Sequence, residues 1–329
     1  MMLNRWKKVA LFSLLGIVIA VLVAAGLEVY GALWSNPQWT FISRDAPKME
    51  TYGVGTRVDI RTGRFSPNEG LVHFPLETDL KQVDLRGTLW LHSDLPKTET
   101  YALVALVDYI QAPVVVSETS RSAHIVQVKP HSRAKVDFAL TIPSQEGRHK
   151  LALLIFQAPE THRLDDKFRF LTDGMCFYQV LDVVIGDDEI FPTVVYQQAP
   201  ETKSNVSQVE FSGILINRDA HNNRTAWLTE TVHSQQTLTY YVHLGNDGRS
   251  RVPYALIAFL DWQQIPVAGE GSEAFSGFIE EGGRLTLPAE VRIPSEGSAH
   301  ELQVIYVPDP NGPIDHVIPS LRVGLVQTP

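Results

Sequence analysis

Residues 101–114 read YALVALVDYIQAPV, and residues 254–267 read YALIAFLDWQQIPV. The second half of the chain therefore repeats a stretch of the first half at an offset of 153 residues. Further along, the match continues at an offset of 151, where Ile142-Pro143-Ser144 corresponds to Ile293-Pro294-Ser295. Because the register is kept over roughly a hundred residues, the pattern indicates a tandem duplication.

Each copy consists of short apolar segments separated by turn residues, which is the pattern of an all-β fold. Helical periodicity is absent outside the N-terminal region. Seven or eight short strands per copy predict a sandwich of immunoglobulin type. The strands predicted in the first copy span 57–65, 84–92, 101–109, 113–117, 124–128, 134–142, 149–157 and 177–185. We therefore expect two tandem immunoglobulin-like β-sandwich domains, 57–186 and 205–329, joined by a linker over 187–204.

A family resemblance rests on two motifs in each copy. In the first, a strand ends in Asp108 and is followed later by Gly147-Arg148-His149-Lys150-Leu151. In the second, the same motifs are Asp261 and Gly297-Ser298-Ala299-His300-Glu301-Leu302. This succession resembles the cell-adhesion-related (CARDB-type) immunoglobulin-like domains of bacteria and archaea. The resemblance implies an extracellular binding or spacer module without catalysis.

An uncharged run of 19 residues, 9–27, precedes the two copies. As a helix it is long enough to cross the hydrocarbon core of a bilayer. Basic residues in 1–8 favour a cytoplasmic N-terminal tail, and residues 35–56 have the composition of a juxtamembrane stalk. The alternative is a cleavable signal peptide, since small residues end the run at Val23-Ala24-Ala25. Either reading places most of the chain outside the cytoplasm, in a periplasm or at the cell surface.

The net charge and the cysteine content limit which partners and covalent links we expect. The net charge is −9 and the chain has no long basic run, so we expect no nucleic-acid partner. The single cysteine, Cys176, excludes an intrachain disulfide and is expected to be a buried thiol, with a reactive or intermolecular thiol as the alternative.

The end of the repeated strand carries polar and aromatic residues in both copies. We expect Asp108 and Asp261 to close a turn by accepting hydrogen bonds from backbone amides. The alternative is a ligand or partner contact formed by a cluster at the tip of the loop. Its members would be Asp108, Tyr109, Gln111, Asp261, Trp262 and Gln264.

Recurrent histidines and two acidic loops raise the question of metal ions. His92 corresponds to His243 and His149 to His300 between the copies, and a structural hydrogen bond is the expected role for such residues, with a metal ligand as the alternative. Calcium favours several oxygen ligands on a flexible loop. Solvated turns are the simpler interpretation, so no cofactor is expected apart from possible calcium ions. The candidate calcium ligands are Asp187, Asp188, Asp309, Asn311 and Asp315.

Two strands of each copy are apolar on both faces, although a strand between core and water should alternate. In the first copy these strands are 101–107 and 151–156, which immunoglobulin topology would place side by side. One face would then leave the core as an apolar patch, formed by Ala102, Val104 and Leu106 with Ala152, Leu154 and Phe156, or by the opposite set. Either loops or the other copy cover this patch, or it binds a protein partner.

None of the familiar catalytic or phosphate-binding motifs occurs in the sequence. We therefore expect a membrane-anchored extracytoplasmic interaction or adhesion module with no catalytic activity. The alternative is a structural spacer or accessory subunit of an envelope complex, and a more distant one is a hydrolase-associated carbohydrate-binding module.

Overall fold

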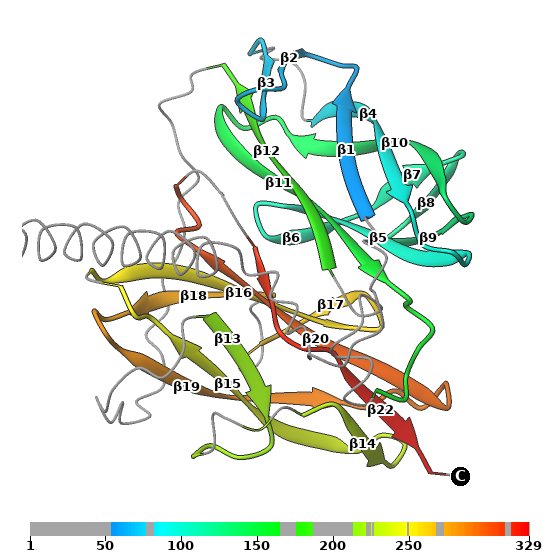
Figure 1. The fold of residues 1–329 in the computed structure, drawn as a ribbon. Coiled ribbons are helices and arrows are strands. Elements are labelled where there is room, and N and C mark those ends of the chain that lie inside the picture. Colours follow the sequence, from blue (N-terminus) through cyan, green and yellow to red (C-terminus); the bar gives the residue numbers. More distant parts are fainter. Residues whose placement is uncertain are drawn as a thin grey trace, which may run out of the picture. The chain divides into compact units, whose positions relative to one another are not determined.

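The structure is a computed structural model, and it describes residues 54–76, 82–164, 176–186, 213–221, 225, 227–248, 250–267, 273–312 and 317–328. The predicted tail, the apolar run over 9–27, most of the stalk and the linker over 187–204 lie outside these residues. Within the described ranges, no helix is long and apolar enough to cross a membrane. All of the regular elements in these ranges are β-strands (Figure 1).

Two sheets form the first sandwich. One has the strand order β1–β4–β10–β7–β8 and the other β2–β3–β12–β11–β5–β6, with β9 also paired to β5. The strands of the first sheet are β1 (Val54–Ile60), β4 (Gln82–Ser93), β10 (Ser132–Pro143), β7 (Val114–Val116) and β8 (Thr119–Arg121). Those of the second are β2 (Arg64–Ser66), β3 (Leu71–Phe74), β12 (Cys176–Ile185), β11 (Gly147–Gln157), β5 (Glu99–Val107), β6 (Ile110–Ala112) and β9 (Ala123–Val128).

The second sandwich repeats this plan with two further sheets. Their orders are β13–β15–β19 and β14–β22–β20–β16–β17, with β18 paired to β16 and β21 to β20. The strands of the smaller sheet are β13 (Gly213–Asn217), β15 (Thr237–Gly245) and β19 (Arg284–Arg292). Those of the larger are β14 (Thr229–Val232), β22 (Val323–Gln327), β20 (Ala299–Pro308), β16 (Val252–Leu260), β17 (Gln263–Ile265), β18 (Ala274–Ile279) and β21 (Ile318–Pro319).

Alternating side chains build a separate core inside each sandwich. In β10, for example, Val136, Phe138 and Leu140 are buried while Lys135 and Asp137 between them are exposed. The first core joins these side chains to Leu103 and Leu153 from the opposite sheet. The second core is built from equivalent strands of the second sandwich and contains no residue of the first. The expected all-β class is thus confirmed as two β-sandwich bodies with four sheets.

The predicted strands of the first copy agree closely with β1, β4, β5, β7, β9, β10, β11 and β12. Two details differ. The strand predicted over 101–109 ends at Val107, because the chain reverses at Asp108 and Tyr109 and returns as β6. The short strands β2, β3, β6 and β8 were not predicted, since three or four residues are too few to show a period. β1 begins at Val54, within the range assigned to the stalk.

Candidate functional site

The second apolar face of the repeated strands is covered by the other copy. β5 and β11 are neighbours, as expected from immunoglobulin topology. Their outward side chains form a third buried cluster with the equivalent side chains of β16 and β20. This intercopy cluster consists of Ala102, Val104, Leu106, Tyr109, Ala152, Leu154 and Phe156 with Ala255, Ile257, Phe259, Trp262, Ile305, Val307 and Val317. The expected patch therefore exists, and of the two readings of it the structure shows coverage by the second copy.

The turns that follow β5 and β16 have the same tight geometry. Asp108 and Tyr109 have φ values of 49° and 69°, and Asp261 and Trp262 have 50° and 65°. Positive φ at both central residues of a two-residue hairpin defines a type I′ turn, which normally favours Asn or Gly. An aromatic residue at the second position is strained, so its side chain must contribute contacts that offset the backbone cost.

Those contacts are made across the two copies. The Tyr109 hydroxyl donates a hydrogen bond to the carbonyl of Pro310. The Trp262 ring stacks on Phe156 with a centroid distance of 4.5 Å, and the Arg322 guanidinium lies 5.0 Å from its centroid. Each turn therefore presents its aromatic side chain to the opposite sandwich.

Two glutamines join the turns by reciprocal hydrogen bonds. The backbone N–H of Gln111 donates to the side-chain Oε1 of Gln264 at 2.5 Å. The backbone N–H of Gln264 donates to the side-chain Oε1 of Gln111 at 2.7 Å. Nε2 of Gln111 donates to the carbonyl of Trp262 at 2.7 Å, while Nε2 of Gln264 donates to that of Tyr109 at 2.8 Å. Equivalent groups thus contact each other in both directions, as in the interface of a two-fold dimer.

The repeated aspartates and histidines pair within each copy. Asp108 accepts a hydrogen bond from the Lys150 amide at 2.9 Å and contacts Nδ1 of His149 at 2.7 Å. Asp261 does the same with the Glu301 amide and His300. The aspartates do bind backbone amides, but those of the neighbouring strand and not of their own turn. The histidines have the structural role that their recurrence indicated.

The ring of His149 contacts an acceptor on each side. Nδ1 contacts the Asp108 carboxylate, and Nε2 lies 2.9 Å from the Gln145 carbonyl. Both nitrogens must donate, so the ring is an imidazolium. Burial opposes this charge, yet the two hydrogen bonds and the carboxylate together raise the pKa of His149 above its usual value.

The residues after these histidines place opposite charges at the junction between copies. Lys150 is 3 % exposed, and its Nζ lies 2.7 Å from Asp182 and donates to the carbonyl of Gly312 at 2.7 Å. Glu301, at the equivalent position, is 1 % exposed and pairs with Arg322 and with His162 of the first copy. Burial raises the pKa of Glu301, opposed by the His162 hydrogen bond and the Arg322 charge. Lys150 and Glu301 are therefore both paired with groups of opposite charge, which offsets the free-energy cost of burying a charge.

The arginine beside Glu301 also binds the backbone of the first copy. Arg322 donates to the carbonyls of Gln157 at 2.5 Å and Ala158 at 3.0 Å. Nearby, Leu164 and the Thr229 hydroxyl exchange hydrogen bonds through the Leu164 amide and carbonyl. The chain that leaves β11 is thereby fixed to the second sandwich.

The candidate calcium residues are only partly described. Asp187, Asp188 and Asp315 lie outside the described residues. In the other loop, Asp309 has a φ of 46° and its carbonyl accepts from the Gly312 amide at 3.0 Å, so it forms a turn that includes Asn311. The described residues contain no group of three or more His, Cys, Asp or Glu side chains that could hold a metal ion.

The only cysteine lies beside the intercopy cluster. Cys176 packs against it from the start of β12 and is half-buried, less than the buried thiol that the sequence predicted. Burial raises the pKa of its thiol to about 12, so the thiolate is scarce at neutral pH. This environment favours the expected inert thiol.

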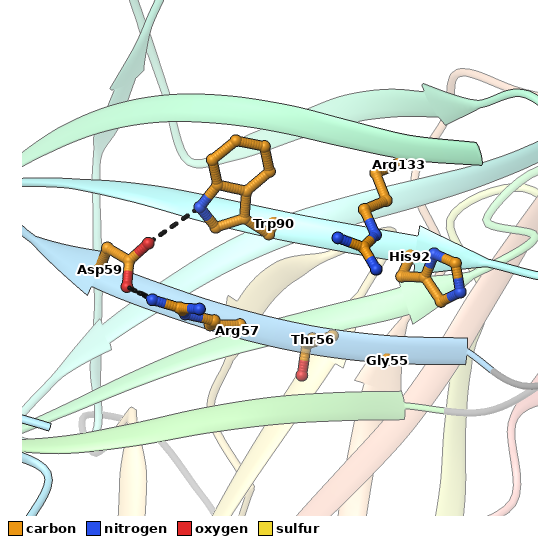
Figure 2. Close-up of a pocket in the computed structure, with 7 residues that line it drawn as sticks. All are labelled: Gly55, Thr56, Arg57, Asp59, Trp90, His92 and Arg133. Carbon is orange, nitrogen blue, oxygen red and sulfur yellow. Dashed lines mark hydrogen bonds and ion pairs between the residues drawn. The ribbon is translucent and has the colours of Figure 1, made fainter. Parts of the chain in front are cut away.

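A pocket of about 540 Å³ lies on the outward face of the β1–β4–β10 sheet (Figure 2). Asp59 accepts hydrogen bonds from Arg57 at 2.8 Å and from the Trp90 indole at 3.0 Å. The Arg57 hydrogen bond lowers the pKa of Asp59, which remains a carboxylate. Further along the strands, Arg133 lies opposite His92 in register. The pocket is lined by Gly55, Thr56, Arg57, Asp59, Trp90, His92 and Arg133.

Of these pocket residues the sequence singled out only His92, through its correspondence with His243, and it did not predict the pocket. Its one available signal was the alternation along β1 and β10, which places Arg57 and Asp59, and Arg133 and Lys135, on the face that points away from the core. Alternation predicts exposure and does not distinguish a binding pocket from an ordinary solvated face.

The corresponding face of the second sandwich is closed at the equivalent histidine. His243 follows His92 at an offset of 151, but it is 0 % exposed. Its Nε2 lies 3.0 Å from Asn217, and its Nδ1 lies 3.0 Å from the Thr286 hydroxyl. Burial, with the positive charge of Arg284, lowers the pKa of His243 to about 4. The two faces therefore differ although the two histidines occupy corresponding positions in the sequence repeat.

Comparisons with known proteins add little to this geometry. No family model matches the chain, and no curated protein matches it. Among solved structures, it is similar to red sea bream transglutaminase, with 10 % identity, 83 % of this chain and 31 % of that chain covered, and a TM-score of 0.24. It is also similar to the ASH/PapD-like domain 7 of human CEP192, with 16 % identity, 42 % and 96 % covered, and a TM-score of 0.23.

The chain thus spans about a third of the length of the transglutaminase that it matches. Both similarities are distant and concern β-sandwich domains of the immunoglobulin-like and PapD-like type. At such scores neither carries an argument about function.

Proposed function

We propose that the chain is a non-catalytic interaction module, built from two immunoglobulin-like sandwiches and held to a membrane by residues 9–27, with its bulk outside the cytoplasm. One observation carries the proposal. The repeated chemistry-bearing side chains, which include Asp108, His149 and Gln111, are engaged in holding strands and copies together. They support a scaffold in preference to a reaction centre.

The strand pattern favours the immunoglobulin type for each sandwich. In the first, β5, β11 and β12 are successive neighbours in one sheet, while β1, β4 and β10 form the other. This is the division into C–F–G and A–B–E strands that immunoglobulin-like domains have. Such sandwiches commonly serve as binding or spacer modules, and the resemblance to cell-adhesion-related domains points the same way.

The outward face of the β1–β4–β10 sheet favours an interaction module over a simple spacer. A spacer needs rigidity, which the intercopy cluster supplies, but it has no need of a pocket that groups an indole with two guanidinium groups. Aromatic and arginine side chains are enriched where proteins bind partners. This face is therefore the surface through which we expect the module to act.

A photo-crosslinking residue introduced at exposed positions tests this proposal in the native membrane. Placed at Lys135, on the outward face, it should give discrete cross-linked products. Placed at Thr231, an exposed position on β14, it should give few. Equal yields at both positions would favour the spacer, and extraction of the full chain by alkaline carbonate without detergent would contradict the membrane anchor.

A further inference from the structure

The pocket of Figure 2 combines groups that are already paired with groups that are not. Asp59 is fully engaged, because its two oxygens accept from Arg57 and from the Trp90 indole (Figure 2). The indole N–H is therefore unavailable to a ligand. A ligand can still contact the flat face of the ring of Trp90, which is half-buried and lines the pocket.

The basic residues of this face differ in their ion pairs, and Asp137 pairs with both Lys135 and Arg61. Across the three strands, Arg57 pairs with Asp59 at 2.8 Å and Lys135 pairs with Asp137 at 3.0 Å. Arg133, in the neighbouring row, is exposed and has no ion-pair partner among the described residues. In a chain of net charge −9, an unpaired guanidinium in a pocket is a local site for an anion.

A buried polar atom beside Arg133 also lacks a partner. Nε2 of His92 pairs with Asp94 at 2.9 Å, whereas Nδ1 is buried and has no hydrogen-bond partner within the part of the chain that the structure describes. This atom has almost no accessible surface, so it lies behind the pocket wall and is not itself offered to a ligand. Arg133 and His92 are opposite each other in the β10–β4 register.

We propose that this pocket binds an acidic saccharide, a sugar ring that carries a carboxylate. The planar Arg133 guanidinium would hold the carboxylate through two parallel hydrogen bonds. The apolar C–H face of the sugar ring would pack on the Trp90 indole, with His92 lining the same pocket. A volume of about 540 Å³ is in the range of small-molecule sites.

The position of the pocket favours a sugar over a peptide. The floor of the pocket is the face of β4, whose backbone groups are paired on both sides by β1 and β10, although β1 is itself the edge strand of this sheet. Peptides that bind sheets usually pair with a free strand edge. Ring stacking and a single carboxylate clamp require no backbone pairing.

Calorimetric titration of the detergent-solubilised full chain tests this inference. The probes are a disaccharide of galacturonic acid, its neutral galactose counterpart and inorganic phosphate. We expect binding of the acidic disaccharide alone. Arg133→Gln should weaken it about ten-fold or more, because a charge-assisted hydrogen bond is lost. Trp90→Phe should weaken it less, and Arg121→Gln, on exposed β8, should leave it unchanged.

Several results would overturn the inference. These are equal affinity for the neutral disaccharide, binding of phosphate in competition with the acidic one, or an unchanged affinity in Arg133→Gln that retains the wild-type melting temperature. The inference rests on the proposed function, since it names the ligand of the same face. If cross-links still form at Lys135 while no saccharide binds, the saccharide is excluded and the interaction module stands.

Discussion

The first sandwich has two outer faces of opposite character. The face of β5 and β11 is apolar, and the second sandwich buries it in the intercopy cluster. The face of β1, β4 and β10 carries Arg57, Trp90 and Arg133 around an open pocket. On the first face, buried charges such as Lys150 have partners; on the second, Arg133 has no ion-pair partner among the described residues. The difference separates the surface that assembles the molecule from the surface left for a ligand.

The largest effect is expected from a charge placed in the assembling face. Ala255 is fully buried in the intercopy cluster, so Ala255→Asp would bury an unpaired carboxylate. The expected loss of unfolding free energy is about 3 to 5 kcal/mol. Urea denaturation measures it, with Thr119→Asp on exposed β8 as the control that should change little. A loss below about 1 kcal/mol would mean that the two faces do not pack together.

The next largest effect is expected from His243, the buried histidine on the outward face of the second sandwich. The folded pKa of His243 is about 4 against an unfolded value of 6.5, so the unfolded chain binds a proton first as the pH falls. The contribution of His243 to stability should be complete above pH 6.5 and should fall by up to about 3 kcal/mol as the pH falls to 4.

Unfolding free energies measured from pH 7 to pH 4 test this contribution. His243→Gln should remove part of the acid-induced loss of unfolding free energy, whereas Thr119→Gln, on exposed β8, should keep the wild-type pH dependence. The same pH dependence in both variants would show that the buried environment of His243 has no bearing on stability.

A smaller effect is expected when two lysines are compared, one on each face of the first sandwich. Lys150→Met leaves the Gly312 carbonyl without its buried donor and should cost about 1 to 3 kcal/mol. Lys135→Met removes an exposed ion pair and should change stability by less than about 1 kcal/mol. Chemical denaturation of both variants gives the comparison, and equal losses would contradict the buried role of Lys150.

Much of the fold could be predicted because it rests on local signals. The repeat of 101–114 at 254–267 indicated the duplication, and alternation gave eight strands of the first copy with small errors at their ends. The double-sided apolar character of β5 predicted a second apolar face, formed by Ala102, Val104 and Leu106 or by the opposite set, and only the structure shows that the first set is buried against the other copy. These are properties of single strands, which periodicity can reveal.

The site could not be predicted, since it depends on contacts between distant parts of the chain. Asp108, Tyr109 and Gln111 were expected to face a ligand or their own turn, yet Tyr109 and Gln111 contact the other copy. No local pattern shows that a type I′ turn carries Tyr109 because Pro310 lies opposite its hydroxyl. Similarly, His243 is buried whereas His92 lines a pocket. This difference in burial depends on Asn217 and Thr286, which contact His243 only in the folded chain.

The central claim is that the repeated stretch joins the two sandwiches into one cooperative unit. Glu50 to Pro329 form one compact unit in the structure, and the intercopy cluster is continuous across both sandwiches. Differential scanning calorimetry of the solubilised full chain tests this most directly. We predict one endotherm whose calorimetric and van't Hoff enthalpies agree. Two endotherms, or a calorimetric enthalpy about twice the van't Hoff value, would contradict the claim, because the sandwiches would then unfold independently.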